Sequence, residues 1–169
     1  MKNVSVKYSM LATVAVVTMC VFSACGGDDD TPEGDTSIGV HRIDIQINDN
    51  GTGCEVLNIF YGIRRDGSYA NIYENGKKLE LDAATHTWYT EEVRELSIQT
   101  EDGCGAIVAS INITGPNGRN VTKDVTVSLV GYVNGKRLKS QTFTLPAGHH
   151  IMSAAFSTDT MELHEEVSE

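Results

Sequence analysis

The sequence is poor in residues and motifs that commonly carry catalysis. Its 169 residues include four cysteines, three prolines and one tryptophan, and aromatic residues make up only 7%. It contains no Gly-x-Ser-x-Gly turn, which presents the nucleophile of many hydrolases. It also contains no glycine loop followed by Lys-Ser or Lys-Thr, the motif that cradles nucleotide phosphates. These absences argue against the common serine hydrolases and against phosphate-loop enzymes.

Basic residues are also scarce. The chain carries 13 Lys and Arg against 23 Asp and Glu, a formal net charge of −10. Nucleic-acid binding depends on a basic stripe that neutralises phosphates. The nearest approach to such a stripe is in two short clusters, Arg64-Arg65 and residues 136–139, each a local turn feature. We therefore expect no nucleic-acid partner.

The first 24 residues have the features of a secretory signal. Lys2 and Lys7 give a basic start, and residues 10–22 are uncharged and almost wholly apolar. This stretch is shorter than the roughly 20 apolar residues of a membrane-spanning helix, and no basic flank follows it. We expect residues 1–24 to be removed on export, which changes the formal charge from −10 to −12.

The signal ends in Phe22-Ser23-Ala24-Cys25, which resembles the lipobox of Gram-negative lipoproteins. In that family an apolar residue, usually leucine, and two small residues precede the cysteine that becomes the diacylated N-terminus. The resemblance implies cleavage before Cys25 and attachment to a membrane through lipid on Cys25. The alternative is ordinary secretion, with cleavage after Ala24 and a free cysteine.

An acidic run, Asp28-Asp29-Asp30, follows the cysteine. It resembles the export signal of surface lipoproteins in Gram-negative gut anaerobes. The resemblance implies an outer-membrane lipoprotein exposed on the cell surface, with a periplasm-facing lipoprotein as the alternative. Neighbouring like charges also extend a chain, so residues 25–36 are interpreted as the lipidated cysteine and a flexible acidic tether.

Two cysteines remain after removal of Cys20 and lipidation of Cys25, namely Cys54 and Cys104. An even pair in an oxidising compartment predicts a disulfide. Closing a loop of about 50 residues would contribute roughly 4 kcal/mol in the chain-entropy model. The alternatives are two buried thiols or a metal half-site, although neither cysteine has a CxxC partner or a nearby histidine.

Alternating apolar residues predict an all-β domain over residues 37–158. Residues 41–47 alternate as in a half-buried strand, whereas residues 54–63 are more continuously apolar, as in a strand buried on both sides. Asn75-Gly76 and Asn134-Gly135 predict two tight hairpins. Roughly eight or nine short strands without a long helical pattern indicate an antiparallel, immunoglobulin-like β-sandwich. A small antiparallel β-barrel is the alternative.

The last residues, 159–169, are acidic and contain too few apolar side chains to fold alone, so we interpret them as a disordered tail. Within this tail, Asp159-Thr160-Met161 resembles the short acceptor motif for protein O-glycosylation in the same gut anaerobes. The resemblance implies a sugar on Thr160.

We expect neither a metal site nor a cofactor nor a catalytic site. His149 and His150 are adjacent, and adjacent residues of a strand point to opposite sides, so they chelate one ion poorly. Asp49-Asn50-Gly51 lacks the spaced carboxylates and the bidentate glutamate of a calcium loop. Carboxylates are abundant, but glycoside cleavage needs two at a defined separation in a cleft.

One aromatic group stands out in the irregular middle of the domain. Tyr69, Tyr73, Trp88 and Tyr89 could form a flat stacking surface for sugars. The alternative is that the lone tryptophan packs in the core, as is common in sandwiches. We therefore expect a non-catalytic binding or adhesion module, with glycans as candidate ligands. The second hypothesis is an accessory envelope protein that binds a protein partner through an edge strand, and the third is a small hydrolase.

Overall fold

The computed structural model describes residues 37–159 and 165–168. The predicted signal, the lipidation site Cys25, the tether and the predicted acceptor Thr160 lie outside the described residues. Among the described residues there are twelve strands and one short 3-10 turn, η2 (Pro116–Gly118). None of their helices is long and apolar enough to cross a membrane.

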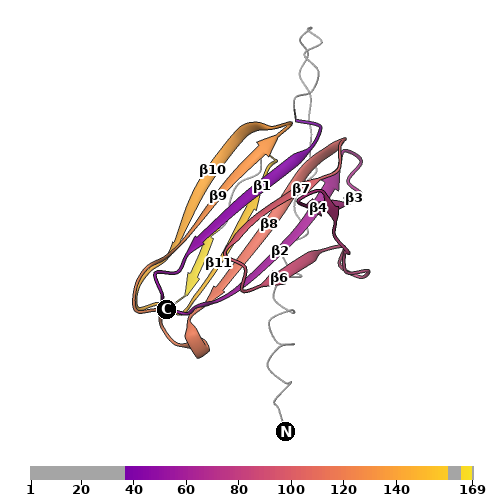
Figure 1. Cartoon of the computed structure of the whole chain (residues 1–169). Coiled ribbons are helices and arrows are strands. Elements are labelled where there is room, and N and C mark those ends of the chain that lie inside the picture. Colours follow the sequence, from indigo (N-terminus) through magenta and orange to yellow (C-terminus); the bar gives the residue numbers. More distant parts are fainter. Residues whose placement is uncertain (1–36, 160–164, 169) are drawn as a thin grey trace. The chain divides into compact units, whose positions relative to one another are not determined.

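The strands form two antiparallel sheets that pack face to face (Figure 1). The first, called the β1 sheet, has the order β10 (Lys136–Leu145), β9 (Val125–Val133), β1 (His41–Asn48), β7 (Glu95–Thr100), β4 (Ile72–Glu74) and β5 (Lys77–Lys78). The second, called the β2 sheet, has the order β12 (Glu165–Ser168), β11 (Ile151–Ser157), β8 (Cys104–Thr114), β2 (Glu55–Arg64) and β3 (Tyr69–Ala70). A further strand, β6 (Trp88–Glu91), also pairs with β2.

The predicted antiparallel β-sandwich is confirmed, and the sheets do not close into the alternative barrel. In β1, Ile43, Ile45 and Ile47 are buried between the sheets, as the alternation of residues 41–47 predicts. Side chains from β9 and β10 of the same sheet lie beside them, and side chains from β2, β8 and β11 fill the opposite side of this core. The strand number exceeds the predicted eight or nine because the irregular segment between residues 69 and 91 contains four strands of two to four residues.

Both predicted hairpins are present. Asn75 and Gly76 have φ values of 49° and 78°, and Asn134 and Gly135 have φ values of 50° and 76°. These left-handed conformations are the ones that a two-residue hairpin turn requires. Asn134 has a second role, because its Oδ1 accepts a hydrogen bond from the Val40 N–H at 2.9 Å and fastens the chain entering β1.

The predicted disulfide is wrong. Cys54 precedes β2 and Cys104 begins β8, but in the antiparallel pairing Glu55 lies opposite Thr114 and Arg64 lies opposite Cys104. The cysteines are thus at opposite ends of the sheet, about 30 Å apart at roughly 3.3 Å per strand residue, whereas a disulfide needs Cα atoms within about 7 Å. Both are free, buried thiols, and burial raises the pKa of each.

The end of the chain also differs from the prediction. The sequence predicts a disordered tail over residues 159–169, but the structure pairs residues 165–168 with β11 as β12, with Ala154 opposite Glu165 and Ile151 opposite Ser168. Strand pairing at a sheet edge uses main-chain hydrogen bonds, so an acidic sequence can form it without apolar side chains.

Candidate functional site

One outer side of the sandwich is apolar where an exposed sheet surface is ordinarily polar. The sequence predicts that residues 54–63 are buried on both sides. In β2, however, only the inward residues such as Val56 and Phe60 are buried, while the outward residues are half-buried. We call this outer side of the β2 sheet the tyrosine face. Its central outward residues are Leu57, Ile59, Tyr61, Ile63, Tyr69, Tyr89, Val108, Ser110, Asn112, Ile151, Ser153 and Ala155, and the exposed Glu91 lies at its β6 edge.

Strand pairing places three tyrosines at the β2 edge of this face. Tyr89 of β6 lies opposite Ile59, and Tyr69 of β3 lies opposite Ile63, two residues beyond Tyr61. The side chains of Tyr69 and Tyr89 are accessible, at 40% and 59% exposed, and Tyr61 is half-buried. Figure 1 shows β6 running alongside β2 at this edge.

Ring contacts hold part of this group in place. The Tyr69 ring stacks on the His86 ring with centroids 4.6 Å apart, and meets the Tyr61 ring edge-on at 6.2 Å. Such aromatic pairs contribute about 0.5–1.5 kcal/mol beyond their buried area. Partial burial raises the pKa of the Tyr61 phenol. The ring of Tyr89 has no such aromatic contact among the described residues, which leaves it open to a ligand.

A polar row lies beside the tyrosines on β8 and β11. Asn112 sits between Leu57 of β2 and Ser153 of β11, and the Ser153 hydroxyl donates to its Oδ1 at 2.8 Å. The Asn112 Nδ2 is shielded and has no hydrogen-bond partner among the described residues. Ser110 lies two residues away on the same side. The tyrosine face thus combines an apolar floor, rings at one edge and an unpaired amide donor.

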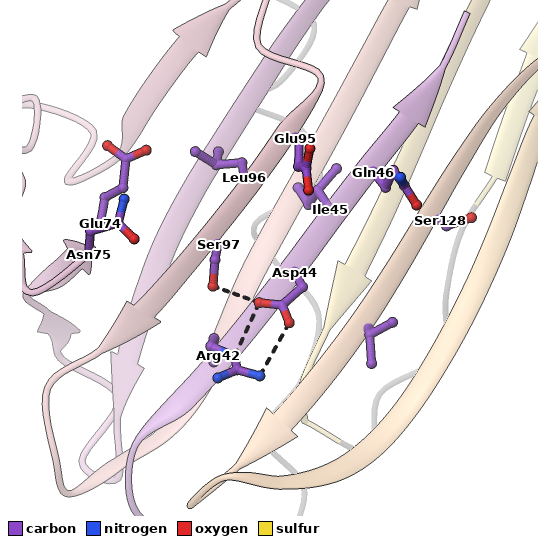
Figure 2. Close-up of a pocket in the computed structure, with 11 residues that line it drawn as sticks. Arg42, Asp44, Ile45, Gln46, Glu74, Asn75, Glu95, Leu96, Ser97 and Ser128 are labelled. Carbon is purple, nitrogen blue, oxygen red and sulfur yellow. Dashed lines mark hydrogen bonds and ion pairs between the residues drawn. The ribbon is translucent and has the colours of Figure 1, made fainter.

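The opposite outer side, on the β1 sheet, has a different chemistry, and we call it the charged face. Arg42 and Asp44 form an ion pair at 3.1 Å, and the Ser97 hydroxyl donates to Asp44 at 2.6 Å (Figure 2). The Arg42 guanidinium also lies 4.0 Å from the centroid of the Tyr132 ring. This face is slightly hollowed, with a volume of about 520 Å³ whose lining also includes Gln46, Glu74, Asn75, Glu95 and Ser128. Arg42 and Asp44 are occupied by each other and by neighbouring side chains.

The four aromatic residues proposed from the sequence do not form one surface. Tyr69 and Tyr89 share the tyrosine face, but Tyr73 belongs to the other sheet, opposite Gln99 of β7. The Trp88 ring lies 5.9 Å from the Phe60 ring and packs against the core. Tyr61 and His86 were not predicted as site residues, although Tyr61 falls on the same alternating positions as Leu57 and Ile59.

A buried polar cluster closes one end of the sandwich. The His41 Nε2 lies 2.8 Å from the Ser37 carbonyl and 3.0 Å from the Cys104 carbonyl, so it carries the proton. The Nδ1 therefore accepts from the Thr158 hydroxyl at 2.8 Å, while the Ile107 N–H donates to that same oxygen. Burial lowers the pKa of His41, outweighing its carbonyl contacts. Because both ring nitrogens are occupied by the fold, the cluster is structural.

Several carboxylates are also committed to the fold. Glu101 pairs with Arg64 and accepts a hydrogen bond from Asn71 Nδ2 at 2.8 Å, and the hydrogen bond from Asn71 lowers the pKa of Glu101. Asp49 pairs with Arg94 at 3.2 Å. Within residues 37–159 and 165–168, no group of three or more His, Cys, Asp or Glu side chains is arranged to hold a metal ion.

Comparisons with known proteins agree on the fold. No protein-family model matches the sequence, and no curated protein matches it. A crystal structure of a DUF4425 family protein from Bacteroides ovatus is 17% identical, with a TM-score of 0.59 over 74% of this chain and 99% of that chain. A DUF4425 domain of unknown function from Bacteroides vulgatus is also 17% identical, with a TM-score of 0.58 over 74% and 98%.

A third solved structure is the calcium-bound form of a protein from Parabacteroides distasonis. It is 15% identical, with a TM-score of 0.51 over 82% of this chain and 99% of that chain. At these identities the likeness shows a shared fold alone.

Proposed function

We propose that the protein is a non-catalytic binding module that binds a glycan through the tyrosine face. The observation that carries this proposal is the placement of Tyr61, Tyr69 and Tyr89 on one open side of the β2 sheet. Aromatic rings offer apolar surfaces on which the C–H faces of a sugar can pack. The open ring of Tyr89 is the main contact in this proposal, because the Tyr69 ring is already stacked on His86.

The rest of the face supplies what a sugar needs besides a ring. Leu57 and Ile59 form an apolar floor beside Tyr89, and the half-buried Asn112 carries an unpaired amide N–H that a turn of its side chain would present to a hydroxyl oxygen. A ligand site commonly combines an apolar lining with a few placed polar groups. Binding requires no covalent step, so the proposal assigns no catalytic residue.

The proposal includes a cellular location. The lipobox-like Phe22-Ser23-Ala24-Cys25 and the acidic run after it support a lipoprotein of the outer membrane that displays the sandwich on the cell surface. Growth with a labelled fatty acid tests this. Label is expected on the wild-type chain and not on a Cys25→Ala variant, and protease treatment of intact cells should remove the sandwich. An unlabelled wild-type chain would contradict lipidation.

Glycan binding is tested with the soluble chain that begins at Gly26 on a glycan array. We expect Tyr89→Ala to weaken binding about tenfold, equivalent to about 1.4 kcal/mol. Tyr73→Ala is the matched control, because Tyr73 is a half-buried tyrosine on the other sheet. Trp88→Ala is unsuitable because Trp88 packs on the core. Equal binding by Tyr89→Ala and wild type, or no binding to any glycan, would contradict the proposal.

A protein partner on the same face is the second candidate. It is favoured by the apolar outward residues Leu57, Ile59 and Ile63, since apolar patches with charged surroundings are typical of protein interfaces. In this case Leu57→Ser would weaken capture of an envelope protein, and the glycan array would show no binding.

A further inference from the structure

The centre of the tyrosine face lacks charge in a chain that is otherwise rich in it. The whole sequence has 36 charged residues by the count of Lys, Arg, Asp and Glu, 13 basic and 23 acidic. None lies in β8 or β11, and the two in β2, Glu55 and Arg64, lie at its ends. The other acidic residues of this sheet belong to its edge strands, Glu91 to β6 and Glu165 and Glu166 to β12. The centre of this face therefore carries neither a cation nor an anion.

This absence limits the ligands that the face can bind. A carboxylate or sulfate placed over β8 would lose hydration without gaining a partner of opposite charge, which is costly. The exposed Glu91, opposite Leu57 at the β6 edge, would also repel an anion. A ligand without charge avoids both effects.

The unpaired amide of Asn112 indicates that the ligand is nevertheless polar. Its Nδ2 is shielded and without a hydrogen-bond partner among the described residues, while its Oδ1 accepts from Ser153. A shielded donor without an acceptor costs about 1–3 kcal/mol. Because Asn112 as a whole is half-buried, a turn of its side chain would present Nδ2 to a hydroxyl oxygen of a sugar, which would satisfy it. An aliphatic surface or the hydrocarbon of a bilayer would not.

The spacing of the rings sets a minimum length. Tyr89 is opposite Ile59 and Tyr69 is opposite Ile63 on β2. Four residues along a strand span about 13 Å. A single sugar ring is too short to contact both tyrosines, but a chain of sugars lying along β2 can reach from one to the other.

From these observations we infer that the ligand of the tyrosine face is an uncharged sugar chain that lies along β2, contacts Tyr69 and Tyr89, and is bound by Asn112, which lies opposite Leu57 just beyond Tyr89. The inference rests on the proposed function and narrows it to neutral chains. It identifies Asn112 as a ligand-binding residue that no pattern in the sequence indicates.

The test compares neutral chains, uronate-bearing chains, sulfated chains and the constituent monosaccharides on one array, using the chain that begins at Gly26. We expect binding to neutral chains only. The affinity should not depend on salt concentration, because the ligand and the centre of the tyrosine face form no ion pair. Monosaccharides should bind at least tenfold more weakly than chains. Binding to charged chains alone, lost in Tyr89→Ala, would overturn the inference and leave the proposed function standing. No binding to any sugar would overturn both.

Two matched variants test the assignment of Asn112. Asn112→Asp replaces the amide donor with a carboxylate on the tyrosine face, and Gln46→Glu makes the same exchange on the charged face. We expect about tenfold weaker binding for Asn112→Asp and unchanged binding for Gln46→Glu, with thermal unfolding of both recorded to confirm folding. Unchanged binding by a folded Asn112→Asp variant would overturn the assignment.

Sedimentation and vesicle binding cover the other possible occupants. A concentration-dependent dimer that Tyr89→Ala abolishes would assign the face to a second copy of the chain and overturn the inference. Binding of the same lipid-free chain to neutral phosphatidylcholine vesicles, again lost in Tyr89→Ala, would assign the face to a bilayer surface and overturn it as well. We expect a monomer that does not bind the vesicles.

Discussion

The charged face and the tyrosine face are the two outer sides of one sandwich, yet their outward residues differ in polarity. In β1 the inward isoleucines alternate with outward Arg42, Asp44 and Gln46, and the two charged groups pair with each other. In β2 the inward Phe60 is flanked by outward Ile59 and Tyr61, so apolar residues lie on both sides. An outer side can therefore remain apolar where the core does not require it.

The difference teaches where to look for function. Polar outward residues keep an exposed sheet hydrated and need no further explanation. Apolar outward residues add nothing to the core between the sheets and favour association with other molecules. The tyrosine face is thus better explained by a ligand than by stability. The following predictions test that contrast, beginning with the largest expected effect.

The two sides of β2 should differ most in stability. Phe60 is fully buried, so Phe60→Ala is expected to lower the free energy of unfolding by about 3–5 kcal/mol. Ile59 is half-buried on the tyrosine face, so Ile59→Ala should cost only about 1 kcal/mol. Denaturant unfolding measures both. A loss at Ile59 as large as that at Phe60 would mean that the tyrosine face is covered within the folded chain.

Acid should weaken the end of the sandwich where both sheets meet, without acting through either face. Burial lowers the pKa of His41 below its ordinary value of 6.5, so the unfolded chain binds the proton more readily than the folded chain. The contribution of neutral His41 is complete above pH 6.5 and is lost as the pH falls through 6.5 toward the lowered pKa. The free energy of unfolding should decline in that range.

A His41→Gln variant is the control for this pH dependence. It should be less stable at pH 7.5 because hydrogen bonds to Thr158 and to the two carbonyls are disturbed. Its stability should nevertheless fall less steeply below pH 6.5 than that of the wild type, since the titrating group is absent. A slope as steep as the wild-type slope would assign the acid sensitivity to other groups.

The ion pair of the charged face should matter little. Arg42 and Asp44 side chains are each 36% exposed, and pairs so accessible contribute at most about 1 kcal/mol. Asp44→Asn is therefore expected to destabilise by less than that, with a smaller difference in high salt, and to leave glycan binding unchanged. Weakened binding in this variant would move the ligand site to the hollow of the charged face.

The smallest effect on stability is expected at the residue with the largest proposed effect on binding. Tyr89 is 59% exposed, so Tyr89→Ala should change the free energy of unfolding by less than about 0.5 kcal/mol. Thermal unfolding beside the glycan array separates the two roles. A strongly destabilised variant would identify Tyr89 as a structural residue.

The parts of the fold that the sequence predicted are local ones. The alternation of Ile43, Ile45 and Ile47 and the φ requirements of Asn75-Gly76 and Asn134-Gly135 depend on neighbouring residues only. The placement of β1 between β7 and β9 depends on pairings between distant segments, which periodicity does not encode. The sandwich could therefore be predicted, but its strand order could not.

The candidate site was harder to predict because it is assembled by strand pairing. The sequence predicts a disulfide between Cys54 and Cys104, but the register of β2 and β8 places these residues at opposite ends of the sheet. Tyr73 and Tyr69 are close in sequence but belong to different sheets. The apolar outward side of β2 was visible in the sequence, but it was interpreted as a second buried side.

The central claim is that the tyrosine face binds the ligand, and NMR titration of the labelled chain with a neutral sugar chain tests it most directly. We predict shifts concentrated at Leu57, Tyr61, Tyr69, Tyr89, Ser110 and Asn112, with resonances of β1, β7 and β9 nearly unchanged. Shifts concentrated at Arg42, Asp44, Ser97 and Ser128 on the charged face would contradict the claim.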